Sequence, residues 1–555
     1  MTEKTDLIIK QNESHTKQAW LWSGLFGICF SAANVWGYEL EKTDHISFAS
    51  PKAIAIFFLL AVLVTILTRY SWKYRDGLYK RNTDRQLQKK EMHSYPRKYF
   101  FCIWGGLVAC QIPVLLAEYP GFFVYDAQTE VTEVFTRVFT THHPLMHVLL
   151  LGGTVSALHK ITGSYNAGIC TYIICQMLLM TAVFAYVIGL LRQMQTRKWI
   201  RILVFMFYGF FPTIVMYTLC SSKDGLFSAF LLLLSVMLMQ MWQNPQNFMQ
   251  SKKNVAAMIF AATGMMLMRN NGFYSYLVFV PIAFFMLGKY RKKIFPFLLL
   301  PLGLYLLISN TLIFALHAEG GEHQEMLTVP IQQLARTWQA DPDNFDETDK
   351  AVLYSYLSKE GLQHYTPRIS DILKTFFDNA QYEKDSASFW KLWFKIGKRN
   401  PATYLNAWFL TSYGYWYPGA VINVYQGNTV FTFTYTDSSY FGYEVEAPGV
   451  RHSLIPAIDR FYRKLSIEKF QQNILGISLL FAPAFWFWMM AWYAGGQLQR
   501  GNVRRILWML PAFLTWLTVL LGPTYLVRYV IILWYIAPLY ILTHDMAKAK
   551  FDEQM

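Results

Sequence analysis

A small set of ionisable side chains at the edges of long apolar segments could carry chemistry. A charge placed at membrane depth costs free energy, so residues of this kind are functional candidates by default. A carboxylate can act as a general base, and preorganised cations can bind a phosphate or stabilise developing negative charge. The set is Asp126, Lys223, Asp224, Arg269 and Arg528.

Apolar runs are the elements that must position this set. The chain of 555 residues is 54% hydrophobic and 15% charged, whereas about a quarter of the residues are charged in a typical soluble domain. This composition predicts an all-α integral membrane protein with about 12 transmembrane helices. The spans are expected near residues 20–38, 53–70, 99–117, 167–191, 200–219, 225–242, 255–268, 272–288, 294–316, 473–493, 506–521 and 527–542. The net charge of +15 lies in clusters at the ends of these runs, which indicates contact with membrane lipids and no nucleic-acid partner.

The basic loops orient the predicted spans. Residues 69–98 are rich in Lys and Arg and are expected to be cytoplasmic. One further apolar stretch, 143–158, could be counted as a span, but the basic clusters of the later loops would then lie outside. If this stretch is instead a juxtamembrane helix along the outer surface, all these clusters lie inside. We therefore expect a multi-pass plasma-membrane protein with both termini cytoplasmic and the candidate residues on the extracytoplasmic face.

Four parts of the chain follow from this topology. They are an N-terminal part with a cytoplasmic tail, two spans and the basic loop (1–98), a transmembrane module (99–316) with a first outer loop (118–166), a mostly helical extracytoplasmic segment (317–472), and the C-terminal spans and tail (473–555). Thr-rich alternation at 428–435 predicts a β-hairpin within the third part.

Around the candidate residues the chain resembles the GT-C superfamily of integral-membrane glycosyltransferases, which includes the protein O-mannosyltransferases and the bacterial aminoarabinose transferases. Those enzymes have an Asp in a first outer loop, then a His-Pro-Pro-Leu-like juxtamembrane helix, and a second acidic residue at the outer end of a following span. The matching features here are Asp126, the sequence His-Pro-Leu that starts at His143, and Asp224.

The resemblance covers about residues 99–290, and Arg528 with Tyr529 adds a looser similarity. The chain departs from the pattern in two places. Leu145 stands where a second Pro is common, and no acidic residue adjoins Asp126. The second departure leaves open whether a divalent cation binds, and no other cofactor is expected.

The resemblance implies transfer of a sugar from a polyprenyl-phosphate donor to a glycan, lipid or protein acceptor of the cell envelope, with inversion at the anomeric carbon. It implies catalytic roles for Asp126 and Asp224, and binding of the donor phosphate by Lys223, Arg269 and Arg528. Further candidates for substrate contact are His142, His143, Arg336, Tyr415 and Trp416.

Each candidate also has a structural interpretation. Asp126 and Asp224 could be helix N-caps, and Lys223 could extend towards the membrane interface. The histidine pair could form a turn that satisfies its own backbone, and Arg336 could lie on an amphipathic surface helix. The aromatic residues at 413–417 fit the interfacial belt of Trp and Tyr side chains that membrane proteins share.

Three other functions fit the same sequence. A transporter or flippase for lipid-linked saccharides would need the same spans and cations, although transporters often have repeated halves and broken helices. An enzyme like the O-antigen ligases or polymerases would use Arg and His in a late outer loop, where Arg451 and His452 stand. The third alternative is a scaffold without catalytic activity.

Overall fold

The computed structural model describes residues 2–86, 97–420, 445–468, 474, 476–501 and 503–541. Every regular element in these ranges is a helix, and β-structure within them is limited to isolated bridges. The predicted all-α class is therefore confirmed for the described part of the chain. The hairpin predicted at 428–435 lies outside the described residues.

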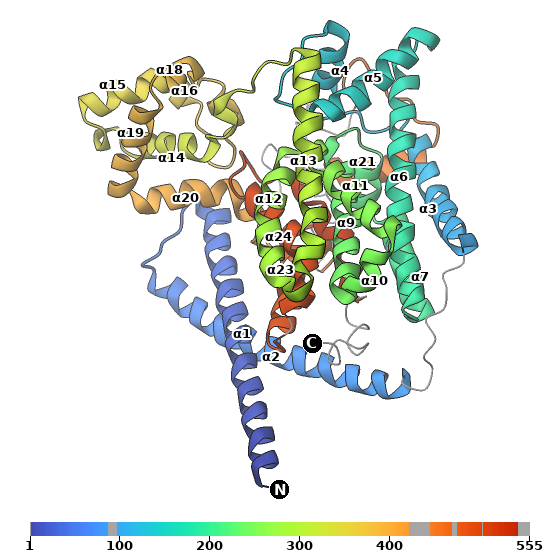
Figure 1. Ribbon diagram of the computed structural model, residues 1–555. Helices are drawn as coiled ribbons and strands as arrows, with labels where there is room; N and C mark the ends of the chain where they lie inside the picture. The colour runs from blue at the N-terminus through green and yellow to red at the C-terminus, as the bar shows by residue number, and fades with distance from the viewer. Residues whose placement is uncertain are drawn as a thin grey trace.

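A bundle of helices, most of them apolar, forms the larger part of the molecule (Figure 1). They are α1 (Thr2–Thr43), α2 (Pro51–Gln86), α3 (Arg97–Ala117), α6 (Tyr165–Gln193), α7 (Lys198–Phe210), α8 (Pro212–Thr218), α9 (Lys223–Gln243), α10 (Pro245–Gln250), α11 (Lys252–Met268), α12 (Asn270–Met286), α13 (Arg291–Leu316), α22 (Ile477–Leu480), α23 (Pro483–Leu498), α24 (Leu510–Val519) and α25 (Ile532–Ile536).

Six helices in the described ranges are long and apolar enough to cross a membrane. The pair α7 and α8, which is bent by 54° where Pro212 starts α8, would make a seventh span. Helices overlap each of the predicted spans, but α11 and α12 have only 17 residues each, and a span typically needs about 20. The number twelve therefore stays a prediction.

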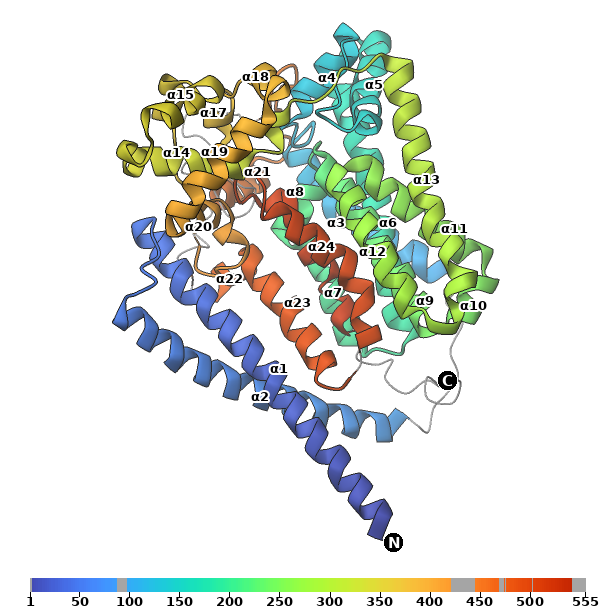
Figure 2. The ribbon, with the colours of Figure 1, turned by 60° about the vertical axis from the view of Figure 1, so that its left-hand side comes forward.

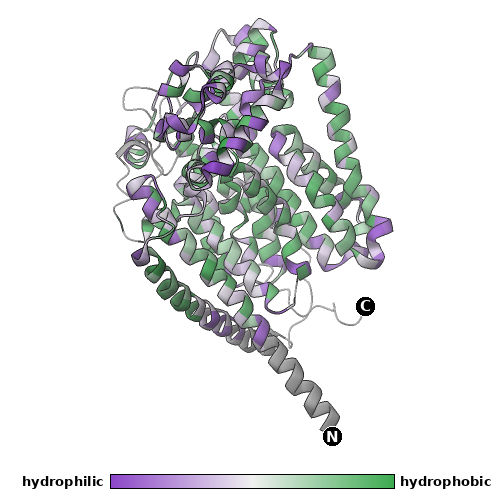
Figure 3. Ribbon diagram, turned by 90° about the vertical axis from the view of Figure 1, so that its left-hand side faces the viewer, coloured by the Kyte–Doolittle hydropathy of each residue, from purple (hydrophilic) through white to green (hydrophobic). Residues whose placement is uncertain are grey.

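The outer helices expose many apolar side chains, and contact of such side chains with water is unfavourable. Only 11% of the apolar window of α2 is buried, and the same holds for the span that contains α13. Leu59 and Phe314 are examples, with 71% and 80% of their surface exposed. These helices stand at the edges of the bundle in Figure 2, and α13 is largely hydrophobic in Figure 3. Surfaces of this kind are stable in lipid, so the chain is a helical membrane protein.

Helices α4 (Ala127–Thr136) and α5 (Leu145–Thr162) pack together at one end of the bundle (Figure 1). Helix α5 corresponds to the stretch 143–158, which was expected to lie along the outer surface. It meets the length and composition of a span, although its mean hydropathy of 1.2 is the lowest of the six. Its orientation relative to the bilayer stays a prediction.

A second group of helices has a hydrophobic core of its own, built around residues such as Leu334 and Phe389. This helical cap consists of α14 (Thr328–Ala340), α15 (Glu347–Tyr356), α16 (Lys359–Gln363), α17 (Asp371–Lys374), α18 (Asn379–Lys384), α19 (Ser386–Arg399) and α20 (Pro401–Ser412). It occupies the segment that was predicted to be mostly helical. Figure 3 shows hydrophilic residues concentrated in the cap and near α4, above the hydrophobic bundle.

Candidate active site

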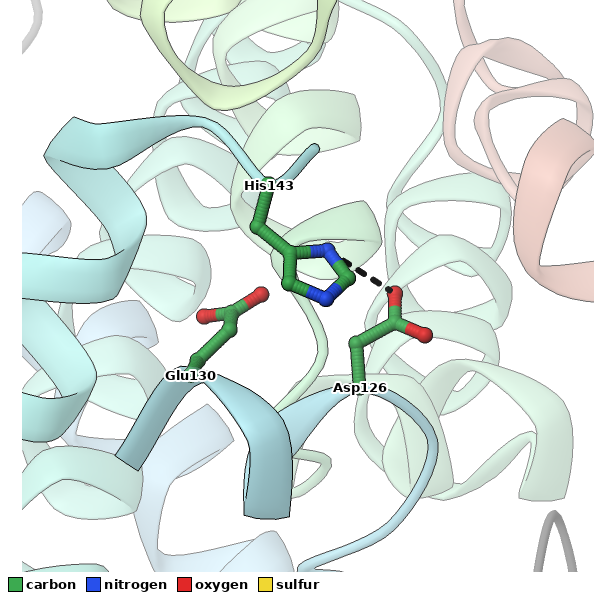
Figure 4. A group of neighbouring side chains, drawn as sticks. All are labelled: Asp126, Glu130 and His143. Carbon is green, nitrogen blue, oxygen red and sulfur yellow. Dashed lines mark ion pairs between the residues drawn. The ribbon is translucent and has the colours of Figure 1, made fainter. Parts of the chain in front are cut away.

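Ionisable side chains from several segments meet at the start of α9. Asp126 ends the loop before α4, Glu130 lies one turn along α4, His143 precedes α5, and Lys223 opens α9. Figure 4 shows the ring of His143 pointing into the space between Asp126 and Glu130. Glu130 and His143 are buried, and the Lys223 side chain is 12% exposed. The cluster is therefore largely removed from water.

The ammonium group of Lys223 lies at the centre of this cluster. Its Nζ atom donates to Asp126 Oδ2 at 2.7 Å and to His143 Nδ1 at 3.0 Å, and lies 3.5 Å from Glu130 Oε1. An ammonium group is only a donor, so Nδ1 of the neutral imidazole accepts and its hydrogen lies on Nε2. Burial, and then the charge of Lys223, lowers the pKa of His143 to about 3. His143 is therefore neutral near pH 7.

Asp126 is an ion-paired carboxylate. Arg528, in η8 (Val527–Val530), donates from Nη1 to Asp126 Oδ2 at 3.3 Å. Burial raises the pKa of Asp126, but Arg528 and Lys223 outweigh this effect and hold the pKa well below its usual value. Asp126 stands at the N-cap position of α4, yet its side chain makes no capping hydrogen bond. Its carboxylate is thus used by the cluster and not as a helix cap.

Asp224 forms a second ion pair beside the first. It pairs with Arg269, and its Oδ2 atom lies 3.9 Å from Nε of Arg528. The N-cap of α9 is Ser222, so Asp224 lies within the first turn of the helix. Both guanidinium groups lie over the ring of Tyr529, at 4.6 Å for Arg269 and 4.9 Å for Arg528. Arg528 therefore links the two carboxylates, and all five residues of the sequence-based set converge.

A buried hydrogen-bonded chain runs from the cluster into the bundle. Glu130 pairs with Nδ1 of His147, and Nε2 of His147 lies 2.7 Å from the hydroxyl of Tyr172. That hydroxyl donates to Oε1 of Gln176 at 3.1 Å. Nε2 of Gln176 in turn donates to the backbone carbonyls of residues 218 and 220, at 3.0 and 2.6 Å. The chain ties α4, α5 and α6 to the turn that precedes Lys223.

The two backbone carbonyls determine the hydrogen positions along this chain. A carbonyl only accepts, so Gln176 presents its amino group to them and its oxygen to Tyr172. Tyr172 then donates to Gln176 and accepts from Nε2–H of His147. One proton is therefore shared between His147 and Glu130. Burial raises the pKa of Glu130, but His147 and Lys223 outweigh it and lower the pKa below its usual value.

Glu130 and His147 are site residues that the sequence-based set omits. Each lies four positions after a candidate residue, Glu130 after Asp126 and His147 after His143. A spacing of four places side chains on one face of a helix. The four-residue spacing was therefore the feature of the sequence that could have identified both Glu130 and His147 as site residues.

Two candidates for substrate contact, His142 and Arg336, are not part of the charged cluster. His142 is exposed, although its ring packs edge-on against that of His143 at 4.5 Å. Arg336 belongs to α14 of the helical cap and donates to the hydroxyl of Tyr365 at 3.0 Å and to the backbone carbonyl of Asp44. Its contacts hold the cap to the turn between α1 and α2.

Tyr415 packs inside the protein, and Trp416 is partly buried against the same core. The hydroxyl of Tyr415 accepts a hydrogen bond from the backbone N–H of Leu526 at 2.8 Å, two residues before Arg528. Tyr415 is fully buried, which does not fit an interfacial belt. Trp416 donates to Ser412 at 3.4 Å. Tyr415 therefore supports the segment that presents Arg528, and neither ring belongs to the charged cluster.

The late-loop pair Arg451 and His452 fastens two loops together. Arg451 forms an ion pair with the buried carboxylate of Glu118. The backbone N–H of His452 donates to the carbonyl of Tyr119 at 2.9 Å. These contacts join the late loop to the first outer loop, which gives Arg451 a structural role.

Comparison with known proteins shows the family. Residues 133–554 match the model of DUF6020, a family of unknown function. The chain belongs to this family. No curated protein and no solved structure matches it. The DUF6020 match includes His143, Lys223 and Arg528, whereas Asp126 and Glu130 lie before its first residue.

Proposed function

We propose that this DUF6020 protein is a membrane glycosyltransferase that transfers a sugar from a polyprenyl-phosphate donor to an acceptor of the cell envelope. One observation carries the proposal: the ionised carboxylate of Asp126 sits between Lys223 and Arg528 at the end of an apolar bundle. A lipid-linked phosphate needs both features, because its head group requires cations and its tail requires an apolar surface.

The proposed reaction is a displacement at the anomeric carbon. A hydroxyl of the acceptor attacks that carbon and forms the new glycosidic bond, while the bond between the carbon and the phosphate oxygen breaks. The hydroxyl proton passes to Asp126, and the bonding electrons leave with the polyprenyl phosphate. Lys223, Arg269 and Arg528 stabilise the negative charge that this phosphate gains.

Binding of the donor activates the base in this proposal. In the unloaded site, Lys223 and Arg528 hold the pKa of Asp126 low, which makes the carboxylate a weak base. A donor phosphate binds the same two cations and weakens their electrostatic effect on Asp126. The pKa of Asp126 then rises towards the range in which general bases are effective, so the donor binds before the acceptor is deprotonated.

Asp224 completes the proposed site. Its Oδ2 atom is buried and makes no hydrogen bond within the described residues. A buried carboxylate oxygen without a donor is costly, and a hydroxyl of the sugar can supply that donor. Asp224 also keeps Arg269 in place through their ion pair.

The proposed topology has twelve spans, with α5 along the outer surface and both termini in the cytoplasm. Asp126, Lys223 and Asp224 then face the outside of the cell membrane, where an enzyme of this kind meets its acceptor. The basic residues between the spans support this orientation through the positive-inside rule.

The test is transfer of radiolabelled sugar in native membranes from a series of defined polyprenyl-phosphate sugars. We expect Asp126→Asn to lower transfer by about 10²- to 10⁴-fold, the usual contribution of a general base. The matched control is Asp76→Asn, which removes a carboxylate of α2 that pairs with Arg500 and should leave transfer unchanged.

The outcomes separate the candidate functions. Robust transfer that survives Asp126→Asn would contradict the assigned base. Movement of the labelled donor across the bilayer, without transfer to any acceptor, would favour a flippase.

A further inference from the structure

Asp126, Glu130 and His143 have the geometry of a metal-binding cluster. One ligand atom from each of the three lies within 4.8 Å of the others. Two carboxylate oxygens and one imidazole nitrogen form a donor set that divalent metals such as Zn²⁺ accept. All three side chains point into a common space, as Figure 4 shows.

A cation already stands in that space. The ammonium nitrogen of Lys223 lies 2.7 Å from Asp126, 3.0 Å from His143 and 3.5 Å from Glu130, measured to the ligand atom of each. These contacts are charge-assisted and mostly shielded from water, so the ammonium is held firmly. We infer that Lys223 is a built-in cation that takes the place of a divalent metal in a cluster able to bind one.

The neighbours of the cluster fit this inference. His147 pairs with the Glu130 oxygen that faces away from Lys223, and Arg528 contacts the same Asp126 oxygen as Lys223 does. Such second contacts orient ligands in metal sites. Here they hold the three side chains around the ammonium, so removal of the Lys223 side chain leaves ligands that still converge.

The helical cap offers a matched comparison. Lys374 bridges two carboxylates, Glu325 at 2.8 Å and Asp371 at 2.9 Å. Among the described residues, Asp126, Glu130 and His143 form the one cluster with three convergent ligands. Loss of the Lys374 side chain therefore exposes two carboxylates without a third ligand.

The test measures Zn²⁺ bound to the purified full chain in detergent, by equilibrium dialysis and elemental analysis. We expect no site-specific Zn²⁺ in the wild type and about one additional Zn²⁺ per chain in Lys223→Ala. Lys374→Ala should bind as the wild type does. The double variant Lys223→Ala with His143→Ala should lose the additional ion.

Two results of this Zn²⁺ measurement would overturn the inference. One is a stoichiometric metal in the wild type that disappears in His143→Ala, because the cluster would then hold a metal in spite of Lys223. The other is a folded Lys223→Ala protein, with a single unfolding transition, that gains no Zn²⁺.

The measurement of bound metal does not depend on the proposed function. One further expectation does rest on that function: sugar transfer by the wild type should be unchanged by EDTA. Loss of transfer in EDTA would overturn the inference while leaving the glycosyltransferase in place. Absence of transfer under all conditions would count against the proposed function, and the Zn²⁺ result would still decide the role of Lys223.

Discussion

At the scale of single residues, burial and the ammonium group of Lys223 together keep His143 neutral. Its ammonium hydrogen points at Nδ1, and a proton on that atom would face a positive charge in a buried place. The folded pKa of about 3 is far below the value of roughly 6.5 expected in the unfolded chain. Between these values the unfolded chain binds more protons, so stability falls as the pH falls.

This difference predicts a specific acid sensitivity. Lowering the pH from 7 to 5 should cost the wild type about 2 kcal/mol through His143, seen as a lower Tm in detergent. His143→Asn should show a smaller drop, because the amide oxygen can still accept from Lys223 but does not titrate. The control is His142→Asn, at the exposed neighbouring position, which should keep the wild-type pH dependence. Equal slopes in all three proteins would refute the argument.

At the scale of elements, the site depends on how α6 holds the turn before α9. Gln176 of α6 donates to the carbonyls of Thr218 and Cys220, and Lys223 and Asp224 follow this turn directly. The same side chain receives the hydrogen bond from Tyr172, at the end of the chain that starts at Glu130. One amide group therefore couples the turn to the charged cluster.

Replacement of the Gln176 side-chain amide should disturb the turn before α9 more than the rest of the helical bundle. Gln176→Leu leaves buried carbonyls without that donor, which should cost about 1–3 kcal/mol of stability, measured as a decrease in Tm. In the proposed reaction kcat should fall more than KM rises, since Lys223 and Asp224 lose their position. Gln240→Leu, which removes a hydrogen bond to Tyr186 near the other end of α9, should leave kcat unchanged. Equal effects on kcat in both variants would show that the turn has no special role.

At the scale of the whole molecule, the helical cap is joined to the turn between α1 and α2 by polar contacts. Arg368 donates to Asp44 Oδ1 at 2.9 Å, and the backbone N–H of Ile46 donates to Asn406 Oδ1 at 2.8 Å. The hydroxyl of Tyr413 donates a hydrogen bond to Glu41 Oε2 at 2.7 Å. Helices α1 and α2 lie at the edge of the bundle (Figure 2), where α1 packs against α23. These polar contacts attach the pair to the cap as well.

Loss of one contact should loosen the turn locally. Arg368→Ala should speed hydrogen exchange of backbone amides near residues 40–50, by roughly tenfold for each 1.4 kcal/mol of local stability lost. Exchange in α6 and α9 should stay unchanged, because their cores are separate from the cap. Lys359→Ala, an exposed substitution within the cap, serves as the control. Faster exchange throughout the bundle would mean that the cap and bundle unfold together.

Several properties followed from the sequence because they are local. Apolar runs of span length predict membrane helices wherever they occur, and the all-α class is confirmed for the described residues. Isolated charges at the ends of these runs are conspicuous for the same reason, so Asp126, Lys223, Asp224, Arg269 and Arg528 could be selected without a structure. The choice between catalysis and capping could not be made, because both need the same residue types at the same positions.

Tertiary structure alone decided which charges neutralise one another. Lys223 lies 97 positions from Asp126 in the chain, and Arg528 lies 402 positions from it. Their contact depends on how α4, α9 and η8 pack, and no local pattern records that packing. The same holds for Glu130 and His147, whose shared proton depends on a buried amide in α6. The sequence by itself predicted that charges would gather at the ends of the apolar segments. Their pairing arose only where packing excluded water, since a buried charge needs a partner.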